Sequence, residues 1–129
     1  MRIERLTAKM QEGLQEGQTL ASGLQHQEIL PEHLLLSLLR QPDGLVRPLL
    51  EKLEVNPRLI EDQLDAELAK RPKISGGRDQ YLGSELRTIL SSAETEMSKL
   101  KDEYVSVEHF LLALIASQSA GGRILRTLP

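Results

Sequence analysis

The side chains of this chain that could do chemistry are three histidines and a large number of carboxylates. The most suggestive pattern is a glutamate followed directly by a histidine, which occurs twice, as Glu32-His33 and Glu108-His109. Adjacent residues of a helix point in different directions, so neither pair brings its two side chains to one site. The zinc-binding helix motif, with two histidines four residues apart, is absent. We therefore expect structural histidines, each bonded to a carbonyl or a helix end, and no metal site.

Other reactive patterns are also missing from the sequence. There is no cysteine, no glycine-rich phosphate loop and no G-x-S-x-G nucleophile motif, so we expect no catalytic residue and no cofactor within these 129 residues. The net charge of −3, with mixed signs and 2% aromatic residues, argues against nucleic acid as a partner. Apolar runs such as 110–115 are too short to span a membrane, and no secretory signal is visible. The composition is typical of a soluble, cytoplasmic domain.

The two Glu-His pairs belong to a longer internal repeat. The segments Glu32–Leu36 and Glu108–Leu112 match at an offset of 76 residues, and the match continues in both directions without gaps. Matching pairs are Leu6/Leu82, Leu14/Leu90, Thr19/Thr95, Leu24/Leu100, Leu38/Leu114, Arg47/Arg123 and Leu49/Leu125. Because matching apolar positions recur at helical spacing, the sequence predicts an all-α fold of two pseudo-symmetric helical repeats.

The first repeat, at about 1–70, is expected to hold four helices. Thr7 and Asn56 stand where helix N-caps are expected. Pro31 and Pro57 stand at the first position of a helix, where a missing N–H costs nothing. The leucines of the second helix leave it almost no polar face, so it should be the buried centre of its half. The expected helices are about 7–25, Pro31–Arg40, Leu45–Leu53 and Pro57 to about Lys70.

A polar linker at about 71–80 precedes the second repeat, at about 81–129. Helices are expected from Ser84 to Leu100 and, capped by Ser106, from Val107 to Ala116, with a break around Ser119–Gly122. The fourth helix has no counterpart, which suggests a piece cut from a longer chain.

The loop Lys101–Ser106 has two possible interpretations. It is either a solvated loop that ends in the Ser106 cap, or an acidic rim beside an apolar groove that takes basic and apolar peptide segments. The sequence leaves both open.

Several of these motifs together resemble the Clp N-terminal repeat domain. Pro31–Leu35 and the stretch Lys101–His109 carry the general resemblance. Four further segments resemble the ClpB-type members in particular: Arg5–Thr7, His26-Gln27, Gly44–Leu50 and Arg71–Gly77. The Gly-Thr-Glu-His motif typical of ClpA- and ClpC-type domains is absent from both repeats. The resemblance covers essentially the whole chain.

The resemblance implies a function that composition and spacing do not show. ClpB-type proteins are hexameric, ATP-driven disaggregases that thread aggregated polypeptides through a ring with help from the DnaK system, and their N-domain helps to recognise substrate. ATP and Mg²⁺ would bind in downstream modules that this sequence lacks. The alternative is the adaptor-docking N-domain of a ClpA- or ClpC-type protease ATPase, which the downstream sequence would discriminate. An independent enzyme or metal protein is a third, weaker hypothesis.

The family assigns substrate binding to a threonine near the start of the chain, an acidic pair and some exposed leucines. Thr7, Asp102 and Glu108 stand at the matching polar places, so the resemblance implies that these three residues bind polypeptide. At the positions where the family has exposed leucines, this chain has Ser92, Glu96 and His109 instead. Glu108 also suits the positive end of a helix dipole, as Glu32 does.

Overall fold

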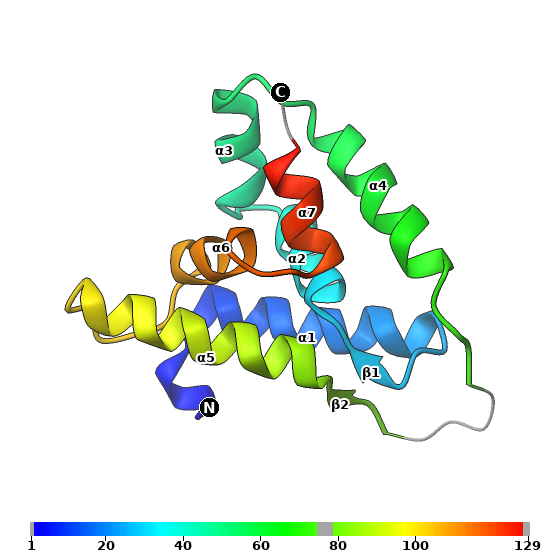
Figure 1. Ribbon diagram of the computed structural model, residues 1–129, viewed down its shortest axis with the longest axis horizontal. Coiled ribbons are helices and arrows are strands. Elements are labelled where there is room, and N and C mark those ends of the chain that lie inside the picture. Colours follow the sequence, from blue (N-terminus) through cyan, green and yellow to red (C-terminus); the bar gives the residue numbers. More distant parts are fainter. Residues whose placement is uncertain (1, 75–78, 128–129) are drawn as a thin grey trace.

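The computed structural model describes residues 2–74 and 79–127, and it confirms the all-α prediction (Figure 1). Residues 75–78 of the predicted linker lie outside the described residues. The described elements are η1 (Ile3–Arg5), α1 (Ala8–Gly23), β1 (Glu28–Ile29), α2 (Pro31–Arg40), α3 (Val46–Lys52), α4 (Pro57–Ala69), β2 (Tyr81–Leu82), α5 (Ser84–Lys99), α6 (Val107–Ile115) and α7 (Ala120–Arg126).

The predicted N-caps are present. The hydroxyl of Thr7 accepts a hydrogen bond from the N–H of Met10, and the side chain of Asn56 accepts one from Arg58. The hydroxyl of Ser106 accepts one from His109. Each cap satisfies a backbone donor that the first turn of a helix leaves without a partner.

Helix α2 is the buried centre of the first half, as predicted. Every residue from Pro31 to Leu39 is buried, and α1 lies directly against it. The contact is close because α1 carries Gly13 at the crossing, where a Cβ atom would collide with the side chain of Leu38. The absence of a side chain therefore lets the two helices approach.

The two halves follow the 76-residue offset in their helices. Both α1 and α5 have 16 residues, and α2 and α6 begin at residues 31 and 107. Between the halves, β1 and β2 form a two-stranded parallel pair, and Leu6 forms an isolated parallel bridge with Val105. The exact repeat boundaries and the truncation of a longer chain stay predictions.

The end of α1 has the same geometry as the end of α5. Gln25 and Lys101 both have φ values near +60°, and the following residues, His26 and Asp102, donate their backbone N–H groups to Ala21 and Met97. This is the Schellman arrangement, which closes a helix with one left-handed residue. It places the side chains of His26 and Asp102 at equivalent positions.

The predicted break around Ser119–Gly122 is wrong after Ser119. Ala120, Gly121 and Gly122 form the first turn of α7, and the hydroxyl of Ser119 accepts the N–H of Gly122 at 3.1 Å. The two glycines suggested a loop because glycine weakens helices. Here α7 passes so close to α6 that a Cβ atom on Gly122 would collide with the carbonyl oxygen of Leu114.

Candidate functional site

The start of α1 and the start of α6 meet through backbone hydrogen bonds. The N–H of Thr7 donates to the carbonyl oxygen of Val105 at 3.0 Å, and the N–H of Val105 donates to that of Arg5 at 2.7 Å. Residues nearly one hundred positions apart are therefore fixed side by side. This pairing brings Thr7 to the first turn of α6.

A cleft of about 440 Å³ opens at this junction, and we call it the Thr7–Glu108 cleft. Its walls combine apolar side chains with two carboxylates and one ammonium group. The lining residues are Thr7, Lys9, Asp43, Gly44, Leu45, Pro48, Ser106, Val107 and Glu108. Glu108 is exposed and makes no hydrogen bond or ion pair with any part of the chain that the structure describes. Its carboxylate is free to accept hydrogen bonds from a ligand.

The structure brings Thr7 and Glu108 together, but Asp102 does not line their cleft. Asp102 lies in the loop between α5 and α6, where its Oδ2 atom is 2.7 Å from Nε2 of His109. The other ring nitrogen of His109 accepts the N–H of Ser106 at 2.8 Å, so the neutral ring carries its proton on Nε2 and donates it to Asp102. The carboxylate of Asp102 is thereby held in one orientation, with about half of its side chain exposed.

The equivalent histidine of the first half is bonded in the same way to a different partner. Nδ1 of His33 accepts the N–H of Leu30 at 2.8 Å, and Nε2 of His33 lies 2.9 Å from Nδ1 of His26. Burial, together with His26 and the charge of Arg71, lowers the pKa of His33 to about 4. Both rings are bonded to a helix end, as predicted.

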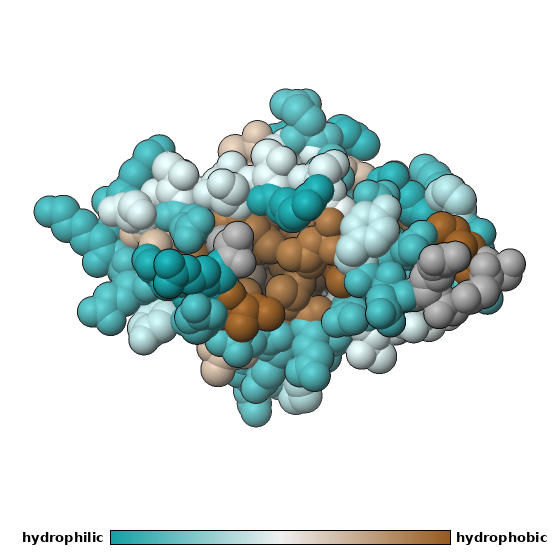
Figure 2. Space-filling view, turned by 90° about the horizontal axis from the view of Figure 1, so that it is seen from below, coloured by the Kyte–Doolittle hydropathy of each residue, from teal (hydrophilic) through white to brown (hydrophobic). Residues whose placement is uncertain are grey.

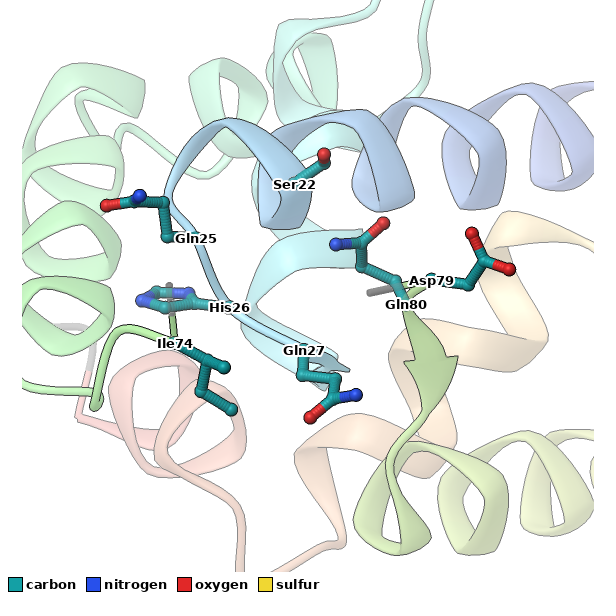
Figure 3. Close-up of a pocket in the computed structure, with 7 residues that line it drawn as sticks. All are labelled: Ser22, Gln25, His26, Gln27, Ile74, Asp79 and Gln80. Atoms are coloured by element: carbon teal, nitrogen blue, oxygen red, sulfur yellow. The ribbon is translucent and has the colours of Figure 1, made fainter. Parts of the chain in front are cut away.

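His26 lines a polar pocket of about 350 Å³ beside the linker (Figure 3). The figure shows its ring next to Ile74, with Asp79 and Gln80 across the pocket from it. Burial, with the positive charges of Lys73 and Arg71, lowers the pKa of His26. Within the described ranges, no group of three or more His, Cys, Asp or Glu side chains could hold a metal ion.

A groove of about 600 Å³ runs between α5 and α6. Ser92 and Glu96, two of the residues at the family's leucine places, line it, whereas His109 is only 3% exposed and does not. Its apolar surface comes partly from Leu112, which is 48% exposed. Glu96 is 3.7 Å from the Nζ atom of Lys99. This groove is therefore a mixed surface of apolar and polar groups.

The sequence did not predict the cleft wall at the start of α3, which consists of Asp43, Gly44, Leu45 and Pro48. No local pattern places these residues beside α6, because the contact depends on how the helices cross. The groove residue Leu112 was also missed. Its exposure follows from its place on the outer face of an otherwise buried helix.

The buried carboxylate of Glu32 links the first half of the chain to the second. Oε2 of Glu32 accepts the N–H of Gly121 at 2.7 Å, and Oε1 lies 3.9 Å from Nη2 of Arg71. Burial raises the pKa of Glu32, and Glu85 acts in the same direction, whereas the Gly121 N–H and the charge of Arg71 oppose the shift. Glu32 thus caps the first turn of α7.

Within residues 2–74 and 79–127, every helix is too short or too polar to cross a membrane.

Comparison with known proteins identifies the family. The model of the Clp repeat (R) N-terminal domain matches residues 5–128. The chaperone protein ClpB of Nitratidesulfovibrio vulgaris is 38% identical over 132 residues, which cover 98% of this chain and 15% of that protein. ClpB of Clostridium tetani is 35% identical over 123 residues, 92% of this chain and 14% of that protein. The chain thus spans about 15% of the length of these curated relatives.

Solved structures show the same fold. The N-terminal domain of the ClpV1 ATPase from E. coli superposes with a TM-score of 0.85 at 28% identity, over 97% of this chain and 78% of that one. A complex of the ClpV N-domain with a VipB peptide gives a TM-score of 0.77 at 22% identity, over 98% of this chain and 81% of that one. From the family match, the ClpB relatives and the shared fold together, this chain belongs to the Clp repeat N-terminal domain family.

Proposed function

We propose that the chain is the substrate-recognition N-terminal domain of a ClpB-type, ATP-dependent protein disaggregase, and that it binds unfolded or aggregated polypeptide without catalysis. The observation that carries the proposal is the unpaired carboxylate of Glu108 in an open cleft beside Thr7. A surface group with no partner inside the chain, next to apolar walls, suits a ligand that brings both donors and apolar side chains.

The shape of the surface and a relative support the proposal. Figure 2 shows an apolar hollow, bordered by hydrophilic side chains, on the lower face of the molecule as oriented in Figure 1. This hollow is a surface separate from the Thr7–Glu108 cleft, which lies beside the start of α3, above α1 in Figure 1. Apolar surface gathered in a hollow is typical of interaction sites. A relative with the same fold, the ClpV N-domain, binds the VipB peptide. The curated relatives named above are ClpB chaperones, and we therefore propose the disaggregase in place of the adaptor-docking domain of a protease ATPase.

The proposed roles of the three predicted residues differ. Glu108 and Thr7 would contact polypeptide within the cleft. Asp102, which is hydrogen-bonded to His109, would form an acidic rim outside the cleft. In the whole protein, ATP and Mg²⁺ would bind downstream modules. The whole protein would be a cytoplasmic homo-hexamer that works with the DnaK system. Six tethered copies of a weak site raise the effective concentration, so each copy can bind weakly.

A binding titration tests this function. A fluorescently labelled polypeptide that a chemical modification keeps unfolded is titrated with the chain, and its unmodified, folded parent with the same label is the control. We expect the fluorescence anisotropy to rise for the unfolded form alone. Equal binding of both forms, or of neither, would contradict substrate recognition.

A further inference from the structure

Glu32 and Glu108 occupy the same position in the two halves but have different surroundings. Each is the second residue of its helix, α2 or α6, and they are separated by the 76-residue repeat offset. The side chain of Glu32 is 1% exposed, whereas Glu108 is exposed to solvent. The carboxylate of Glu32 is therefore covered by other parts of the chain, whereas that of Glu108 faces solvent.

The first turn of α7 covers the carboxylate of Glu32. The N–H of Gly121, in the first turn of α7, donates to Oε2 of Glu32 at 2.7 Å. The first turn consists of Ala120, Gly121 and Gly122, and a Cβ atom on Gly121 would lie only 3.2 Å from Oε2. Small residues let the backbone reach the carboxylate, which is favoured at the positive end of a helix.

The counterpart of this contact in the other half is not made. The repeat offset pairs Gly121 with Leu45, which lines the Thr7–Glu108 cleft at the start of α3. Yet Glu108 has no bonding partner among the residues described, and about 440 Å³ of space lies around it. The cleft is thus the open equivalent of the closed Glu32–Gly121 contact.

We infer that the Thr7–Glu108 cleft binds the first turn of a helix-forming segment with small residues, whose backbone N–H groups donate to Glu108 as Gly121 donates to Glu32. The inference rests on the proposed function and specifies its substrate class. Charge supports it, because the carboxylates of Asp43 and Glu108 outnumber the ammonium group of Lys9 in the cleft. The positive end of a helix is complementary to such a surface.

The test uses the chain's own helix start as a probe. One synthetic peptide carries the sequence of residues 117–126, acetylated and amidated so that it has no terminal charge. A matched peptide carries N-methylglycine in place of Gly121, which removes one N–H and adds no side chain at the α-carbon. The first peptide should shift the backbone NMR signals of Thr7 and Glu108. The second should bind roughly tenfold more weakly or worse, because hydrogen bonds to charged groups are among the stronger ones.

Variants of the protein complete the test. Glu108→Gln should weaken binding of the first peptide by a similar factor, whereas Glu51→Gln, an exposed change on α3 outside the cleft, should leave it unchanged. Equal binding of the two peptides, an unaffected E108Q variant, or no binding at millimolar concentration would each overturn the inference. If the unfolded polypeptide still binds while the first peptide does not, the inference fails and the proposed function stands. If neither binds, both fail.

Discussion

His26 and Asp102 occupy the same position in the two halves of the chain, and each is hydrogen-bonded by the histidine seven residues later. The distances are 2.9 Å from Nδ1 of His26 to Nε2 of His33 and 2.7 Å from Oδ2 of Asp102 to Nε2 of His109. A Schellman turn places both acceptors, so the backbone is the same and only the chemistry of the acceptor differs. One buried histidine therefore faces a second imidazole and the other faces a carboxylate.

The first prediction concerns acid sensitivity. The pKa of His33 is about 4 in the folded chain, below the 6.5 of a free histidine, so the unfolded chain binds more protons between these pH values. The stabilising contribution is complete above pH 6.5 and is lost as the pH falls towards 4, by an amount on the order of a few kcal/mol. Arg71 and Lys73 face the pair and disfavour its protonation further.

Replacing His26 by aspartate should reduce this loss, because a carboxylate stabilises the charged form of His33. Urea unfolding of the parent chain and of His26→Asp at pH 7.5, 6.5 and 5.5 measures the difference. The parent should lose stability over this range and the variant should lose less. Identical pH profiles would show that the His26–His33 pair does not control acid sensitivity.

Much of the fold could be predicted from the sequence because local signals agree with the tertiary structure. Thr7, Asn56 and Ser106 cap helices as expected, and the all-leucine face of α2 is buried. The glycines of α7 misled the prediction, because their role is a close helix crossing that no local pattern reveals.

The candidate site was only partly predictable. Thr7 and Glu108 meet in one cleft, but Asp102 lies apart from it, and the opposite wall comes from α3. The repeat offset paired Glu32 with Glu108, and it could also have paired His26 with Asp102. It could not show that Glu32 is covered and Glu108 open, because that difference depends on how α3 and α7 pack.

The second prediction concerns the cap on α7. Replacing Glu32 by alanine leaves the N–H of Gly121 without its acceptor and should cost roughly 1–3 kcal/mol of unfolding free energy. The matched change Glu108→Ala, at an exposed and unpaired position, should stay within about 0.5 kcal/mol. Urea unfolding measures both, and amide hydrogen exchange should accelerate at the start of α7 in the first variant only. Equal stabilities of the two variants would argue against the cap.

The third prediction tests the close crossing of α6 and α7. Gly122→Ala should destabilise the chain by about 1–3 kcal/mol, because the new Cβ atom would collide with the carbonyl oxygens of Leu114 and Ser117. Gly23→Ala is the control: apart from its chain neighbours and the backbone of its own helix, no atom lies within 4 Å of a Cβ there, and alanine favours a helix by up to about 1 kcal/mol. Thermal unfolding compares the two. A neutral Gly122→Ala variant would mean that α7 is packed more loosely than the structure shows.

The fourth prediction separates the two roles of Thr7. Thr7→Ala removes the N-cap of α1 and should cost about 1 kcal/mol, whereas Thr7→Ser keeps the hydroxyl that accepts from Met10 and should be nearly neutral. Polypeptide binding by both variants is then measured at a temperature at which each is fully folded. If binding is lost in the alanine variant and kept in the serine variant, the hydroxyl contributes to recognition. Unchanged binding in both would confine Thr7 to capping.

The most direct test of the account is an NMR titration of the chain with a permanently unfolded polypeptide. Recognition in the Thr7–Glu108 cleft predicts shift changes around Thr7 and Glu108, reduced in Glu108→Gln but not in Glu51→Gln. High salt should weaken the changes at Glu108, because exposed charges are screened. Shift changes confined to the polar pocket at His26, or no changes at high polypeptide concentration, would contradict the claim that the Thr7–Glu108 cleft recognises substrate.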